Sequence, residues 1–279
     1  MMLKEAIKLI TPPVFIHLAK RLRGKGLMGA YYGLSGDYRS WDEAMAASTG
    51  YDSEIILEKT RTALLKVKNG EAVYERDSVL FDEIEYAWPL LTGLMWVAAK
   101  SGGKLNVLDF GGSLGSTYFQ NRCFLRHLSY VRWNIVEQPQ HVKTGKECFE
   151  DKQLRFYPTI KHCLAENELN VVILGGVLQY LEHPFEVLDE LLRLRCDHII
   201  IDRTPFWDGP TDRLCIQNVP PTIYPASYPS WIFSRHNFLN QISEKGFEVF
   251  MEFDDQDSLD GPVDLIDKGM IIVQSLAKV

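Results

Sequence analysis

The sequence predicts an α/β fold in which a mostly parallel sheet of seven strands follows a helical N-terminal cap. From residue 101 onward, short runs of branched apolar residues alternate with helical stretches, the pattern of a parallel sheet covered on both faces. The first hundred residues show helical spacing and little strand pattern. We therefore divide the 279-residue chain into a basic segment at 1–25, a helical cap region at 26–100 and an α/β domain at 101–279.

Each expected strand is a short apolar run that ends near a turn residue. The seven runs lie at 105–110, 132–137, 154–157, 170–174, 198–202, 247–253 and 270–273. Helices should cover 116–128 and 185–194, because apolar residues recur there at helical spacing. The sheet is thus expected to be complete within the last two-thirds of the chain.

The cap region is expected to be helical after an initial loop. Residues 26–39 are rich in glycine and tyrosine and predict a loop. Helices are expected at 40–47, where the start has capping-box spacing, at 53–68, and at about 79–99. Pro89 should bend or break the last of these helices.

Composition and charge exclude several classes of protein. Apolar residues make up 46% and charged residues 24%, as in ordinary globular proteins. The net charge of −7 argues against nucleic acid as the main partner, since phosphate binding needs a basic surface. The five cysteines are scattered without a CxxC pair, and no spacing of His, Asp or Glu predicts a metal site. A reducing, cytoplasmic setting fits best.

The basic segment at 1–25 is an exception to the acidic balance. It holds six basic residues and one acidic residue, and its apolar residues from Phe15 to Leu22 have helical spacing. An amphipathic helix packed on its own domain explains this pattern. Peripheral contact with the inner face of an anionic membrane is the alternative.

The strongest local signal is the glycine-rich turn after the strand at 105–110. Its small residues are Gly111, Gly112, Ser113 and Gly115. Small residues let the backbone approach a ligand, and the following helix then presents free N–H groups. Glu137, at the end of the next strand, is placed to accept hydrogen bonds from both ribose hydroxyls of an adenosine cofactor.

The turn differs from the G-x-G-x-x-G order of NAD sites. Its pattern, acid-x-G-x-small-x-G from Asp109, resembles the first motif of class I S-adenosylmethionine (SAM) dependent methyltransferases, with Ser113 where glycine is more usual. The segment at 175–181 resembles that family's region beside the adenine and the methyl-donating sulfur. The resemblance implies a Rossmann-like class I methyltransferase sheet with SAM as cofactor. The implied cofactor-binding residues are Asp109, Gly111, Gly112, Ser113, Gly115, Glu137, Gln138, Gly175, Gly176 and Gln179.

The resemblance extends over most of the chain. Its segments are Tyr51-Asp52, 74–78, 108–118, 136–138, 178–181, 202–206 and 223–229. Together they resemble a little-characterised bacterial family of predicted methyltransferases associated with surface-polysaccharide biosynthesis. The family implies a small-molecule or glycan acceptor, such as a sugar, and leaves the substrate and the oligomeric state open.

The residues expected to carry catalysis lie near and after the fifth strand. Asp202 ends that strand, and His236 lies in the long insertion that follows; either could act as a general base toward a hydroxyl acceptor. Arg203 is suited to hold an acidic sugar or phosphate. Aromatic side chains in the insertion could stack on a sugar face or pack a lid. The predicted substrate-binding residues are Arg203, Tyr224, Tyr228 and Trp231.

Two other functions compete with methyl transfer. Gly111 to Gly115 also satisfies G-x-S-x-G, so Ser113 could be the nucleophile of an α/β-hydrolase, with Asp202 and His236 in the required chain order. Against this, the motif strand is expected to be the first of the sheet, and no earlier loop supplies an oxyanion hole. The other alternative is a non-catalytic binding module with a methyltransferase-like fold.

Overall fold

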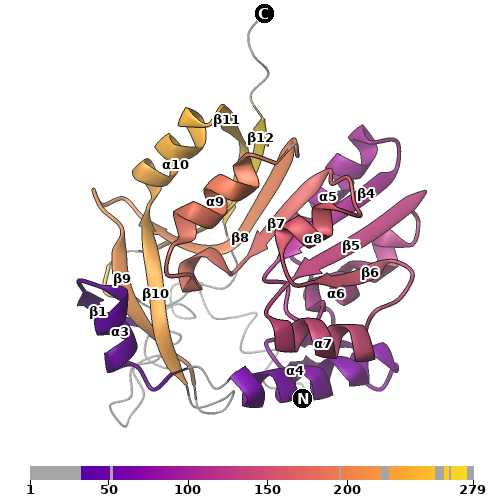
Figure 1. Ribbon diagram of the computed structural model, residues 1–279, viewed down its shortest axis with the longest axis horizontal. Helices are drawn as coiled ribbons and strands as arrows, with labels where there is room; N and C mark the ends of the chain where they lie inside the picture. Colours follow the sequence, from indigo (N-terminus) through magenta and orange to yellow (C-terminus); the bar gives the residue numbers. More distant parts are fainter. Residues whose placement is uncertain are drawn as a thin grey trace, which may run out of the picture.

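The computed structural model describes residues 33–50, 53–194, 196–220, 226–254, 261–263 and 265–274. The basic segment at 1–25 and Tyr224 lie outside the described residues. A ten-stranded sheet runs through the molecule, and helices cover both of its faces (Figure 1). No helix in the described part of the chain is both long and apolar enough to cross a membrane.

Seven strands form the core of this sheet. They are β4 Lys104–Phe110, β5 Tyr130–Val136, β6 Leu154–Tyr157, β7 Val171–Gly175, β8 His198–Trp207, β11 Phe247–Asp254 and β12 Ile266–Gln274. They lie in the order β6-β5-β4-β7-β8-β12-β11, and β12 alone among them runs opposite to the other six. The sequence predicts a mostly parallel, Rossmann-like sheet of seven strands, and this prediction is confirmed.

The strand order reverses between β4 and β7. From β4 the chain builds outward through β5 and β6, and then returns to the other side of β4 with β7 and β8. In open α/β sheets the crevice at the carboxyl ends of the strands on either side of such a reversal is where ligands bind. The topology therefore places the functional site at the carboxyl ends of β4 and β7.

Helices precede the core strands, connect the parallel ones and follow the wing. They are α4 Ser53–Lys68, α5 Trp88–Lys100, α6 Ser116–Leu125, α7 Pro139–Cys148, α8 Ile160–Leu164, the short 3₁₀ helix η1 Leu178–Tyr180, α9 Pro184–Leu192 and α10 Arg235–Glu244. The bounds of α4 are those predicted. Pro89 lies in the first turn of α5, where its missing N–H costs nothing, so it begins this helix and does not bend it.

Buried side chains alternate between the two faces of the sheet. On β8, Ile200 belongs to one buried cluster, and its neighbours Ile199 and Ile201 belong to the other. On β4, Val107 and Leu108 divide in the same way. Successive side chains point to opposite faces, and both faces are covered. Apolar residues are therefore needed at every position, and the central strands appear in the sequence as continuous apolar runs.

The cap region contains strands that the sequence analysis missed. β1 Gly33–Tyr38 pairs antiparallel with β9 Arg213–Asn218, so the loop prediction for this part of 26–39 is wrong. β2 Tyr74–Arg76 and β3 Val79–Phe81 form a hairpin, so the helix predicted from about residue 79 begins only at Trp88. Before the hairpin in the chain, α3 Trp41–Ala47 forms as predicted, with Ser40 as its N-cap.

The insertion after Asp202 extends the sheet. β8 continues to Trp207, five residues past its predicted end. β10 Ser227–Ser234 then runs parallel to the end of β8 and antiparallel to β9. The first part of β8 pairs with β7 and its last part with β10, whereas β12 pairs along β8 from His198 to Phe206. β9, β10 and β1 thus form a separate wing of the sheet, seen on the left of Figure 1.

Candidate functional site

The turn between β4 and α6 has no room for larger side chains. Gly115 donates its backbone N–H to the carbonyl of Gly112 at 3.0 Å, which closes the turn. A Cβ at Gly112 would lie 2.5 Å from the carboxyl carbon of Asp109. Gly111 has φ +72°, and a Cβ there would overlap Val177. Glycine is therefore required at 111 and 112 by space, and at 111 also by backbone conformation.

Asp109 lies beneath this turn as a buried acid. Its side chain is 2% exposed, and Oδ2 accepts a hydrogen bond from the indole Nε1–H of Trp133 at 2.9 Å. Burial raises the pKa of Asp109 to about 6, against the lowering effects of the Trp133 hydrogen bond and the Arg203 charge. The carboxyl group therefore supports the turn from inside and is not open to solvent.

Glu137 lies beside the glycine turn, as its place after the second strand predicts. Its Oε1 accepts from the backbone N–H of Ser113 at 3.3 Å, and its Oε2 accepts from the N–H of Gln138 at 2.7 Å. Each carboxylate oxygen can accept a second hydrogen bond. The carboxylate is thus held at the carboxyl end of β5 with acceptor capacity to spare for hydroxyl groups.

The second side of the crevice is built around Arg203. Its Nη2 donates to the carbonyl of Gly175 at 3.2 Å, and its own carbonyl accepts from Nε2 of Gln179 at 3.0 Å. Gly176, with φ +64°, donates its N–H to the carbonyl of Asp202 at 2.9 Å. The guanidinium lies against Gly176, because a Cβ there would be 3.6 Å from Arg203 Cζ. Arg203 therefore fixes the loop after β7.

The β2–β3 hairpin covers the start of α6. Glu75, 1% exposed, accepts from Oγ–H of Ser116 at 2.6 Å and from N–H of Ser78 at 2.7 Å. Asp77 forms an ion pair with Nη1 of Arg203 at 3.8 Å. The hairpin is therefore joined both to the helix after the glycine turn and to β8 at Arg203.

Backbone strain is concentrated at the same place. Within the described part of the chain, the non-glycine residues with positive φ are Asp77, Ser78, Ser113 and Arg203, at 50°, 64°, 52° and 51°. Such conformations cost about 1 to 3 kcal/mol each, and they persist where the surroundings enforce them, often at functional sites. All four belong to the glycine turn, the hairpin or Arg203.

The sequence contains a signal for the hairpin that the analysis did not use. Two three-residue runs, 74–76 and 79–81, are separated by exactly two residues, which is the commonest hairpin spacing. Positive φ at both Asp77 and Ser78 matches the mirror-image turn that such a loop requires. Asp-Gly or Asn-Gly would have made the signal plain, and the serine obscured it.

The wing contributes aromatic side chains near η1. Trp231 donates its Nε1–H to the carbonyl of Leu181 at 3.0 Å and stacks on Trp41, with ring centroids 6.2 Å apart. Tyr228 makes an edge contact with Tyr180 at 5.3 Å. Two of the predicted substrate-binding aromatics thus face the loop that follows β7, and Tyr224 lies outside the described residues.

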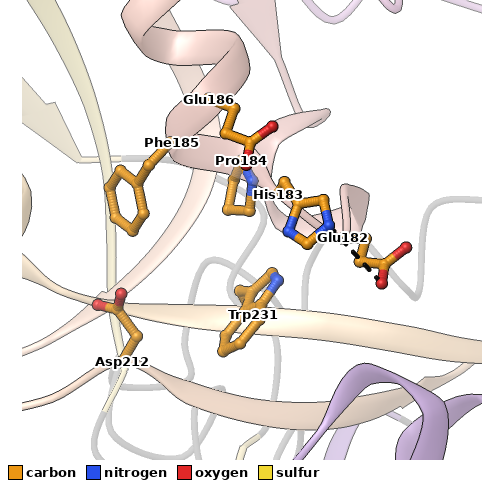
Figure 2. Close-up of a pocket in the computed structure, with 7 residues that line it drawn as sticks. All are labelled: Glu182, His183, Pro184, Phe185, Glu186, Asp212 and Trp231. Atoms are coloured by element: carbon orange, nitrogen blue, oxygen red, sulfur yellow. Dashed lines mark ion pairs between the residues drawn. The ribbon is translucent and has the colours of Figure 1, made fainter.

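A pocket of about 260 Å³ lies between this wing and the start of α9. Figure 2 shows Trp231 and Asp212 on one side and His183, Pro184 and Phe185 on the other, with two glutamates at the rim. Asp212 accepts a hydrogen bond from the N–H of Ser234, and burial raises its pKa. The pocket therefore combines aromatic faces with carboxyl groups.

The two predicted catalytic residues occupy different parts of the molecule. Asp202 is 6% exposed and lies opposite Gly175 in the β7–β8 ladder. His236 is on the exposed side of α10, where its Nε2 lies 3.0 Å from Nδ2 of Asn240. In Figure 1, α10 and α6 are on opposite sides of the molecule. The structure brings Asp202 to the crevice and leaves His236 away from Ser113.

Comparisons with known proteins give only remote likenesses. No known family and no curated protein matches the sequence. Among solved structures, the N-terminal domain of EvdMO1, crystallised with SAH and D-fucose, is 12% identical, covers 81% of this chain and 98% of its own, and has a TM-score of 0.48. The magnesium protoporphyrin IX methyltransferase from Synechocystis PCC 6803, with bound SAM, is 13% identical over 81% and 99%, with a TM-score of 0.44. A SAM-dependent methyltransferase from Clostridium acetobutylicum is 6% identical over 69% and 93%, with a TM-score of 0.45. The strand order of the chain itself carries the assignment of the fold.

Proposed function

We propose that this chain is a SAM-dependent methyltransferase. The observation that carries the proposal is the contact between Glu137 and the backbone N–H of Ser113, at 3.3 Å, at the carboxyl ends of β4 and β5. An acid held there suits the two ribose hydroxyls of an adenosine cofactor. The turn has glycines at 111, 112 and 115 and lacks the order that cradles a pyrophosphate. SAM carries no phosphate.

The residues present fit such a cofactor. Cβ atoms at Gly111 and Gly112 would overlap Val177 and Asp109, so glycine is what lets the turn lie this close to the loop after β7, across the crevice. When bound, SAM supplies an electrophilic methyl group on its sulfonium. In this proposal Glu137 holds the ribose, the turn admits the methionine part, and Gln179 and Gln138 flank the adenosine.

For methyl transfer, the protein has to orient the acceptor in line with the methyl group. Asp202, at the carboxyl end of the predicted fifth strand, is the better-placed candidate to accept a proton from an acceptor hydroxyl. His236 would need to move from the exposed side of α10. The separation of α10 from the glycine turn also weakens the hydrolase alternative, because Ser113 would have no histidine beside it to act as a base.

The proposed acceptor is a small hydroxyl-bearing molecule of the glycan type. The pocket with Trp231 offers an aromatic face and the carboxyl group of Asp212, which suit the face and hydroxyls of a sugar. Its acidic groups favour a neutral or amino sugar over an acidic one. The resemblance to polysaccharide-associated methyltransferases supports this choice. The proposed cytoplasmic placement is supported by the five scattered cysteines, which include no CxxC pair. Membrane contact through residues 1–25 stays a prediction.

Calorimetry with SAM and S-adenosylhomocysteine (SAH) tests the cofactor. We expect both to bind, and Glu137→Ala to weaken them about tenfold to a hundredfold, the worth of a hydrogen bond to a charged group. Asp197→Ala, an exposed acid at the opposite end of β8, is the matched control and should bind normally. Wild-type protein that binds neither ligand would favour a non-catalytic module. Normal binding by Glu137→Ala would overturn the ribose assignment.

The acceptor requires a separate experiment. Labelled SAM would be incubated with the protein and a bacterial extract of nucleotide sugars and glycolipids, and mass spectrometry would search for components that gain one methylene. A neutral or amino sugar should carry the label. Labelling of an acidic sugar alone would contradict the role given to the acidic pocket. Covalent labelling of Ser113 by a serine-directed fluorophosphonate would instead restore the hydrolase alternative.

A further inference from the structure

Glu75 is a buried carboxyl group that accepts hydrogen bonds from neutral groups. It is 1% exposed, and both of its hydrogen bonds come from neutral donors, the hydroxyl of Ser116 and the backbone N–H of Ser78. Burial raises the pKa of Glu75 more than its two hydrogen bonds and the charge of Arg203 lower it. A buried carboxylate of this kind is stabilised by a cation, and the charge of Arg203 does not offset the burial of Glu75.

The position of Glu75 relates it to the glycine turn. Ser116 is the first residue of α6, directly after Gly115, so the carboxyl group of Glu75 lies where the turn ends. The other end of the hairpin is held by the ion pair between Asp77 and Arg203. The hairpin therefore spans the mouth of the turn from α6 to β8.

The charges around the turn are unbalanced. Four carboxyl groups surround the turn, those of Glu75, Asp77, Asp109 and Glu137. Among the described residues, Arg203 is the cation whose charge acts on both Glu75 and Asp109, and it also pairs with Asp77. That guanidinium is already bonded to the carbonyl of Gly175 and to Asp77. The region is thus suited to a ligand with an excess of positive charge. SAM is such a ligand, because its sulfonium and α-ammonium groups outnumber its carboxylate.

We propose that Glu75 binds the α-ammonium group of the methionine part of the cofactor, and that the β2–β3 hairpin closes that end of the site. The proposal rests on the function proposed above and adds a cofactor-binding residue from the cap region. The simpler alternative is that Glu75 only ties the hairpin to α6. The two roles predict different results: only the first requires the negative charge of Glu75 for full affinity toward ligands that carry the ammonium group.

Paired titrations with SAH and 5′-methylthioadenosine separate these roles. Both ligands contain the adenosine and the sulfur, but only SAH carries the ammonium and carboxylate groups. The variant is Glu75→Gln, whose amide can still accept from Ser78 and donate to the hydroxyl of Ser116. We expect it to bind SAH about tenfold to a hundredfold more weakly and 5′-methylthioadenosine within about twofold of wild type. Thermal unfolding would verify that the variant is folded.

Ser116→Ala is the matched control, because it removes the hydrogen bond to Glu75 and keeps the charge. We expect its affinity for SAH to fall by less than about threefold. Equal weakening of both ligands by Glu75→Gln, or no weakening of either, would overturn the proposal, as would a loss in Ser116→Ala as large as that in Glu75→Gln. Wild-type protein that binds neither ligand would instead overturn the proposed function itself.

Discussion

The two halves of the crevice are built in different ways. On the β4–β5 side, a turn of seven residues, Asp109 to Gly115, is held by a buried acid and by Glu137 from the next strand. On the wing side, β1 precedes β9 and β10 by more than 170 residues, and the three strands pair in the order β1-β9-β10 at the edge of the sheet. The first half has local order and a large core, and the second has two small apolar clusters.

Two tryptophans, one in each half of the crevice, illustrate this difference in burial. Trp133 is fully buried and donates its indole N–H to the buried carboxyl group of Asp109. Trp231 is partly exposed and donates to the carbonyl of Leu181. Removing a donor from a buried charge costs more than removing one from a carbonyl near the surface. The cofactor half should therefore be the more sensitive to substitution, and the wing the more tolerant.

The largest effect is expected from Gly111→Ala. Alanine in the left-handed backbone conformation of Gly111 costs about 1 kcal/mol, and its overlap with Val177 costs as much as about 3 kcal/mol more. The free energy of unfolding should therefore fall by an amount on the order of 4 kcal/mol. Denaturant unfolding would measure it, and SAM binding should be lost. Gly102→Ala is the control, since it has a similar φ of +63° and nothing within 4 Å. Equal losses in the two variants would show that crowding in the turn is unimportant.

Asp109→Asn should change stability in the opposite direction. The folded protein holds the Asp109 proton up to about pH 6, whereas the usual pKa of the group is 3.8. Its contribution to stability is fully present below the unfolded pKa and is lost as pH rises through about 6. Asparagine does not ionise, so the variant does not lose this contribution. Its free energy of unfolding should exceed that of wild type by as much as about 3 kcal/mol at pH 7.5 and by little at pH 4. Thermal unfolding across this range would check the difference; a gain that does not depend on pH would contradict the assigned pKa.

The parts of the fold that were predicted correctly are those with local signals. The strands from Leu105 to Val273 follow from apolar runs, and the partnership of Asp109, the glycines and Glu137 follows from the rule that parallel strands end at one edge. The sequence of β1, GLSGDY, carries no comparable pattern, because its glycines are typical of loops and its partner β9 lies far along the chain. Pairing between distant segments leaves little trace in a single sequence.

The candidate site was predicted unevenly for the same reason. Glu75 was part of a segment recognised only by resemblance, and its role depends on the hairpin that brings it to Ser116. His236 was selected for its chemistry, but α10 directs it toward solvent. Residue type alone therefore identified groups that could react, and the topology decided which of them meet.

The smallest effect is expected from Trp231→Phe, on the wing. Phenylalanine keeps an aromatic face but cannot donate to Leu181, which should cost about 1 kcal/mol of stability. Affinity for SAM should stay within about twofold of wild type, because the substitution leaves the glycine turn and Glu137 untouched. Once an acceptor is identified, its KM should rise several-fold, since the ring lines the pocket between the wing and α9. Calorimetry with SAM and acceptor titration would measure the two effects separately. A fall in SAM affinity as large as the rise in acceptor KM would mean that the two halves of the crevice act as one unit, and the distinction between them would not hold.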